Sequence, residues 1–198
     1  MTIRRLALAL LLFGLVPATA FAQGSRLWHV GFGGGVSVPA GDFKDVLKTG
    51  AHGRAFVGIG PASSNFGTRL AVNYQHFDLK GLPVVSGAPT TTSNGSGNIV
   101  SGLANLTYGI NFGILRPYLT AGLGAFDVMS KPESGSSTSD VKFGVNGGAG
   151  VSFKLGQIRG FVEGRYENLF TDKGLDANAT NSKDFAAQVI PVTFGVMF

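Results

Sequence analysis

Charged side chains recur at every second position in several short stretches of the sequence, and they are the residues best suited to chemistry. Glu163 and Arg165 share this spacing, so both side chains lie on one face if the segment is a β-strand. The candidate network comprises Arg54, Arg69, Lys142, Glu163 and Arg165, together with Arg159 and Glu167. Charges withdrawn from water are stable only when paired. We therefore expect Glu163 to meet one or more of these cations inside an enclosed space.

Histidine near an acid is the second pattern of interest. His76 precedes Asp78 by two residues, and a hydrolase of the Ser–His–acid type needs a serine beside such a pair. The conceivable serine partners are Ser86, Ser101, Ser130 and Ser182. One histidine among so many serines does not define a triad, so we expect no enzymatic activity. The sequence has no cysteine, metal-ligand cluster or nucleotide-binding loop, and we expect no cofactor and no metal.

The elements that must position these residues are short segments in which apolar and polar side chains alternate. Glycine, serine, asparagine, aspartate and proline separate them, which is typical of an all-β chain. The expected strands are 27–38, 50–60, 67–77, 98–110, 116–128, 141–154, 157–169 and 185–198. Strands of roughly ten residues can cross a membrane at a tilt. A chain of 198 residues has room for eight such strands but not for the sixteen of a general porin.

The connections between these segments alternate in length. Those at 60–66, 111–114 and 154–156 are short, whereas those at 39–49, 78–97, 129–140 and 170–184 are long. Short turns at the periplasmic side and long loops outside are expected of an outer-membrane barrel. With the N-terminus inside, all four long loops are predicted to be extracellular.

Both ends of the chain carry signals. Residues 1–22 combine Arg4 and Arg5, an apolar run over 6–16 and a small-x-small site at 20–22, which predicts a cleavable signal peptide. The apolar run is too short for a membrane anchor. Residues 23–198 would then form the barrel domain. At the other end, one strand face carries Ile190, Val192, Phe194, Val196 and Phe198, which resembles the C-terminal assembly signal of outer-membrane barrels.

Three stretches resemble the OmpA/OmpX-like outer-membrane β-barrel superfamily. They are VGFGGGVSVPAGDF at 30–43, RPYLTAGLG at 116–124 and FVEGRY at 161–166. The resemblance implies a small eight-stranded, antiparallel, up-and-down transmembrane barrel in the outer membrane of a Gram-negative bacterium. It also implies outer-membrane lipid, lipopolysaccharide and the barrel-assembly machinery as partners. The superfamily contains structural proteins, adhesins, narrow pores and a few enzymes that act on lipid A.

These observations favour a structural or surface-interaction role, with a lumen plugged by polar side chains. The low-complexity stretches 89–96 and 130–138 are candidates for contact with a host or cell surface. A narrow pore is the main alternative, followed by a lipid A acyl hydrolase and a soluble lipocalin-like carrier with its apolar faces inward. The formal net charge of +5 comes without a basic run, so we expect no nucleic-acid partner.

Overall fold

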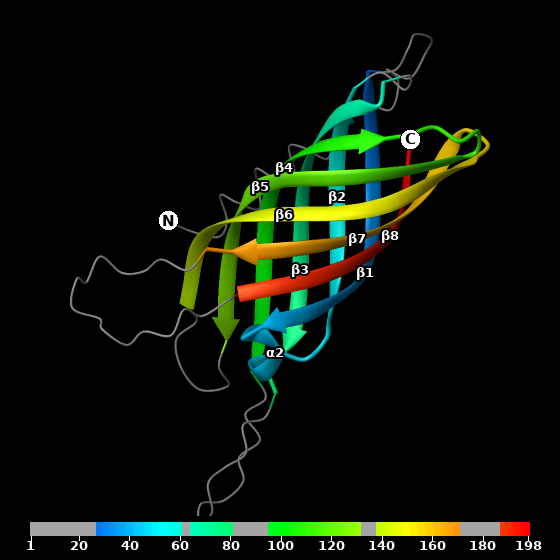
Figure 1. Ribbon diagram of the computed structural model, residues 1–198. Helices are drawn as coiled ribbons and strands as arrows, with labels where there is room; N and C mark the ends of the chain where they lie inside the picture. The colour runs from blue at the N-terminus through cyan, green and yellow to red at the C-terminus, as the bar shows by residue number, and fades with distance from the viewer. Residues whose placement is uncertain (1–26, 61–63, 81–94, 132–137, 171–186) are drawn as a thin grey trace, which may run out of the picture.

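Eight antiparallel strands close into a barrel in the computed structural model, which describes residues 27–60, 64–80, 95–131, 138–170 and 187–198. Each strand pairs with its neighbours in sequence, and the first strand pairs with the last (Figure 1). The strands are β1 (Trp28–Gly41), β2 (Gly50–Ile59), β3 (Phe66–Asp78), β4 (Ser96–Gly109), β5 (Leu115–Lys131), β6 (Thr138–Leu155), β7 (Ile158–Leu169) and β8 (Ala187–Met197). The expected fold class is thus confirmed.

The boundaries differ from expectation mainly at the ends that carry the long connections. There β5 and β6 each extend about three residues further, pairing as far as Ser130 with Thr138. The connection after β1 contains a short helix, α2 (Phe43–Val46), that the sequence pattern did not predict. The predicted signal peptide and most of the stretches 89–96 and 130–138 lie outside the described residues. Within the described part, no helix is long and apolar enough to span a membrane.

Side chains alternate strictly between the two faces of the wall, as period-two geometry requires. In β3, Arg69 and Asn73 are buried in the lumen, whereas Leu70 and Val72 are exposed on the outside. The same rule leaves a belt of large apolar side chains on the outer surface, including Phe32, Leu106, Leu119, Leu123, Phe143 and Phe194. A lipocalin-like carrier would have the opposite arrangement. The wall therefore faces lipid.

The lumen contains apolar as well as polar side chains. At the end that carries the long connections, apolar side chains close it. They are Leu47, Phe77, Ile99, Phe126, Leu169 and Val189, all nine-tenths or more buried. The sequence analysis did not anticipate these inward apolar residues. At the other end the strands are joined by short turns, where Gly113 and Gly156 have φ of 65° and 67°, a conformation that favours glycine.

Glycine also sets how tightly the wall packs at some positions. A Cβ built on Gly122 would lie 2.1 Å from the carbonyl oxygen of Ala104 on the paired strand. Gly102, on the outer face of β4, has no atom within 4 Å of the equivalent point. The lumen side of β5 thus needs glycine at 122, whereas the outer side of β4 tolerates a side chain at 102.

Candidate functional site

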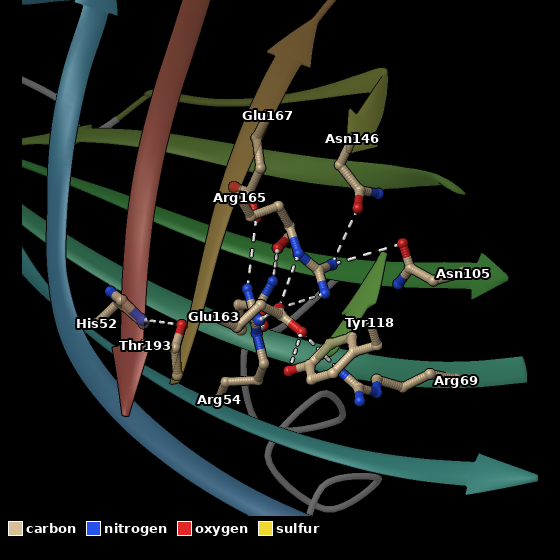
Figure 2. A network of polar contacts seen from close by, with 12 residues as sticks. His52, Arg54, Arg69, Asn105, Tyr118, Asn146, Glu163, Arg165, Glu167 and Thr193 are labelled. Atoms are coloured by element: carbon tan, nitrogen blue, oxygen red, sulfur yellow. Dashed lines mark hydrogen bonds and ion pairs between the residues drawn. The ribbon is translucent and has the colours of Figure 1, made fainter. Parts of the chain in front are cut away.

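A buried carboxylate at the centre of the lumen gathers three arginines (Figure 2). Glu163 Oε1 accepts hydrogen bonds from Arg54 Nη1 and from Arg165 Nη2, the latter at 2.7 Å. Its Oε2 accepts from Arg69 Nη1 at 2.7 Å and from the Tyr118 hydroxyl at 2.9 Å. We call these five residues together with Glu167 the central network. Charge-assisted bonds of this kind are among the stronger hydrogen bonds in proteins.

Except for that of Arg165, which lies two residues from Glu163 on the same strand, these contacts join different strands across the lumen. Glu163 lies on β7 and Arg69 on β3, which are four strands apart in the ring of eight and therefore opposite each other. Arg54 comes from β2 and Tyr118 from β5. Arg165 lies on β7 itself, and the side chains of these residues converge on one carboxylate, as Figure 2 shows. The network therefore spans the lumen and links opposite walls through side-chain contacts.

Amides and a second carboxylate complete the polar layer. Glu167 accepts a hydrogen bond from Gln75 Nε2 at 2.8 Å, a second contact between β7 and β3, and lies 3.8 Å from Arg54 Nη2. Arg165 donates to Asn146 at 3.0 Å, and Arg54 Nε donates to Asn73 at 2.7 Å. Most of the buried charge thus has a partner, as burial requires.

Aromatic rings hold one of the arginines in place. The Arg69 guanidinium carbon lies 4.2 Å from the centre of the Phe56 ring and 5.3 Å from that of Tyr118. Phe56 in turn packs edge-to-face on Phe161, with ring centres 5.6 Å apart. A guanidinium stacked on aromatic faces gains a cation–π contribution. The ring contacts and the ion pair together restrict where Arg69 can point.

Lys142 lies apart from the central network, contrary to its place in the expected charge set. Its ammonium is 2.9 Å from Asp140 near the end of β6 that carries a long connection. The register explains the separation: Lys142 pairs with Phe126, whose fully buried ring occupies the lumen at that level. Lys142 was assigned to the same face as Glu163, but it lies at a different depth along the barrel.

Several residues of the polar layer were not predicted from the sequence to belong to the site. Tyr118, Gln75, Asn73 and Asn146 were not among the candidate site residues. The same holds for His52, which lies 2.8 Å from the Thr193 hydroxyl and 3.0 Å from that of Ser37. The period-two pattern places such residues inside, but it does not show which of them meet.

The histidine considered for hydrolysis lies outside the lumen. His76 is half exposed, contacts Asn98 Oδ1 at 2.7 Å and has Asp78 at 3.8 Å. Ser101 is buried in the lumen, where it accepts from Asn73 at 3.1 Å. The side chains of Ser86, Ser130 and Ser182 lie outside what the structure describes. Among the described residues, no serine hydroxyl contacts His76.

The C-terminal strand shows the alternation expected of it. Ile190, Phe194 and Phe198 are exposed on the outer face, and Val192 and Val196 are partly exposed beside them. The inward side chains of β8 include Val189 and Thr193. A role for the outer row in barrel assembly stays a prediction.

Comparisons with known proteins agree with this architecture. The family model described as "Outer membrane protein beta-barrel domain" matches residues 8–198. Neisserial surface protein A is similar in structure, with a TM-score of 0.59, 16% identity, and coverage of 88% of this chain and 98% of that one. Ail of Yersinia pestis, in complex with the heparin analogue sucrose octasulfate, has a TM-score of 0.54, 16% identity, and coverage of 86% and 97%. No curated protein sequence matches significantly.

Proposed function

Because the chain belongs to the outer membrane protein β-barrel family and resides in the outer membrane, we propose that it is a structural or surface-interaction barrel with a plugged lumen and four extracellular loops. The central network is the observation that carries the proposal. Four residues from four strands bind Glu163, and an apolar cluster fills the lumen beyond it. A continuous water path would have to displace both.

A narrow pore is the second candidate, because ion pairs that plug a lumen can also act as a gate. Planar-bilayer recordings of the wild type and of Glu163→Gln separate the two. The proposal expects no stepwise conductance from the wild type and lower stability, without conductance, from the variant. Stable, regular channel events that change in Glu163→Gln while its stability is unchanged would establish the gate instead.

The outward orientation of the long connections can be tested with single cysteines, since the chain has none of its own. Lys44→Cys lies on α2, between β1 and β2, and Asn111→Cys lies in a short turn; both side chains are exposed. On intact cells, a membrane-impermeant maleimide should label position 44 and leave position 111 unlabelled. The reverse pattern would place the short turns outside and refute the surface role.

Three partners of the barrel are proposed with this role. Lys44, Lys48 and Lys80 surround a recess beside α2, which supports contact with the phosphates of lipopolysaccharide at the outer end. The outward apolar row on β8 supports recognition by the barrel-assembly machinery. A host or cell-surface ligand would bind through the long loops. Replacing Phe194 with serine should reduce the amount of folded barrel in the membrane, measured by its faster gel migration without boiling.

Catalysis is not part of the proposed role. His76 meets Asn98 and Asp78 on the outer surface, and Ser101 lies in the lumen. Overproduction should leave the acylation of lipid A unchanged, which mass spectrometry of extracted lipid A would check. A change that is lost in His76→Ala would establish the hydrolase instead.

A further inference from the structure

A second polar region lies in the lumen at the short-turn end, below the central network. It is a cavity of about 40 Å³, and we call it the mouth cavity. Its lining includes His29, Arg69, Thr107, Arg116, Tyr118 and Ser152. A cavity of this size exceeds what one water molecule needs. It has room for a group of a few heavy atoms.

The charges around the mouth cavity are all positive. Arg69 and Arg116 line it, and Arg159 on β7 lies within electrostatic reach of both Arg116 and His29. Among the described residues, no aspartate or glutamate side chain lines it. The carboxylates of the central network are already bound by Arg54, Arg69 and Arg165. The cavity therefore has uncompensated positive charge.

Hydrogen-bond donors in the cavity lack acceptors. Arg69 is 95% buried and uses Nη1 on Glu163, but its Nε has no partner within the described part of the chain. Arg116 donates from Nη2 to the Ser64 carbonyl at 2.9 Å, and its buried Nε is likewise without a partner. Unpartnered buried donors are rare and costly. An acceptor bound in the cavity would satisfy them.

Two glycines leave the space that the His29 imidazole and the Arg116 guanidinium occupy. A Cβ on Gly58 would lie 2.0 Å from His29 Nε2, and a Cβ on Gly109 would lie 2.8 Å from Arg116 Nε. Any larger residue at 58 or 109 would displace the imidazole or the guanidinium. The backbone thus leaves room for one neutral imidazole and one guanidinium in the cavity lining.

We propose that the mouth cavity binds a small oxyanion, such as a phosphate group, that enters from the short-turn side. Arg69 and Arg116 would donate to it from their guanidinium groups, and the side chains of Thr107 and Ser152 belong to the same lining. Guanidinium groups match the geometry of phosphate oxygens. A free anion and the headgroup of an inner-leaflet phospholipid present the same phosphate chemistry.

The test is calorimetric titration of inorganic phosphate into the full-length barrel in a phosphate-free maltoside detergent at constant ionic strength. The proposal expects saturable binding at one site per barrel. Arg116→Gln should weaken this binding about tenfold, the loss expected for one charge-assisted hydrogen bond. Arg116→Lys should lose less, because it keeps the charge but not the fork of donors.

Lys154→Gln is the matched control, because Lys154 is exposed at the same end of the barrel, on the strand paired with β7, and does not line the cavity. It should bind phosphate within about twofold of the wild type. Faster gel migration without boiling confirms that each variant is folded. Equal losses in Arg116→Gln and Lys154→Gln, or no saturable binding by the wild-type protein, would overturn the proposal.

Nanodiscs distinguish the two sources of the phosphate group. If phosphate binds as tightly in phosphatidylglycerol discs as in the phosphate-free maltoside, the site takes a dissolved anion. If phosphatidylglycerol weakens it in the wild type but not further in Arg116→Gln, the lipid headgroup competes for the cavity. Both results support an oxyanion site. A weakening of the same size in the wild type and in Arg116→Gln would mean that phosphate does not bind beside Arg116, which contradicts it.

Discussion

The central network and the mouth cavity lie next to each other in one lumen, but they differ in whether their arginines have carboxylate partners. At the centre, Glu163 is bound by three arginines and a tyrosine, and Glu167 lies beside them. At the mouth, Arg116 and Arg159 have no carboxylate partner among the described residues. Arg69 belongs to both regions, since its Nη1 donates to Glu163 and its side chain lines the mouth cavity.

Arginines that point into the lumen therefore need not share one role. Where guanidinium groups converge on a buried carboxylate, they link strands on different sides of the barrel. Where they gather without one, they form a binding site for an anion. Position relative to a carboxylate, rather than residue type or face, separates the two roles.

The largest effect is expected from Glu163→Gln, which removes the shared carboxylate. Three guanidinium groups would be left with at most an amide oxygen as partner. Breaking a buried ion pair by removing one member costs about 3–5 kcal/mol. We expect a loss of that size in the free energy of unfolding, measured by urea titration of the barrel in lipid. A loss below about 1 kcal/mol would show that the network does not hold the walls together.

Two glycine-to-alanine substitutions, one on the lumen side and one on the outer side, test how tightly the lumen side is packed. Gly122→Ala would bring a methyl group against the Ala104 carbonyl, whereas Gly102→Ala points into open space outside. Overpacking typically costs about 1–3 kcal/mol, so Gly122→Ala should lower the unfolding free energy by that amount. Gly102→Ala should leave it nearly unchanged. Equal effects in the same titration would mean that the lumen side is not the tighter one.

Glu167→Gln should cost less than Glu163→Gln. Glu167 receives one hydrogen bond, from Gln75, and its ion pair with Arg54 is 3.8 Å long. A glutamine retains an acceptor for Gln75, so we expect a loss of about 1 kcal/mol, the size of one ordinary hydrogen bond. A loss as large as that of Glu163→Gln would place the centre of the network at Glu167.

The smallest effect on stability is expected at the mouth. Arg116→Gln removes a charge that repels Arg69 and Arg159 and pairs with no carboxylate among the described residues. In the absence of phosphate, the unfolding free energy should change by no more than about 0.5 kcal/mol. Several kcal/mol of destabilisation would show that Arg116 is a structural partner like Arg165.

Much of the fold was predictable, because period-two alternation and loop lengths are local properties of the sequence. The faces of Arg54, Arg69, Glu163 and Arg165 followed from that alternation alone. Depth along the barrel did not, since it depends on the stagger between strands. Lys142 was therefore grouped with Glu163, although Phe126 occupies the lumen at its level.

The contacts between residues on opposite strands could not be predicted from local sequence patterns either. Glu163 and Arg69 are 94 residues apart and meet only because β3 and β7 face each other in a ring of eight. The inward Phe77 and Phe126 were not anticipated, since hydrophobicity alone assigns such side chains to the lipid face. The mouth cavity depends on these same long-range relations, together with the space left by Gly58 and Gly109.

We expect the central network to exclude solvent while the mouth cavity admits it. Two single-cysteine variants on the same strand test this central claim most directly. Ser101 and Thr107 both face the lumen on β4, but Ser101 is 1% exposed while Thr107 lines the mouth cavity. The measurement is the rate at which a small charged thiol reagent modifies Ser101→Cys and Thr107→Cys in the folded barrel. We expect position 107 to react at least about tenfold faster, the ratio set by a difference of about 1.4 kcal/mol in access. Equal rates would mean that water passes the central network and that the lumen is a pore.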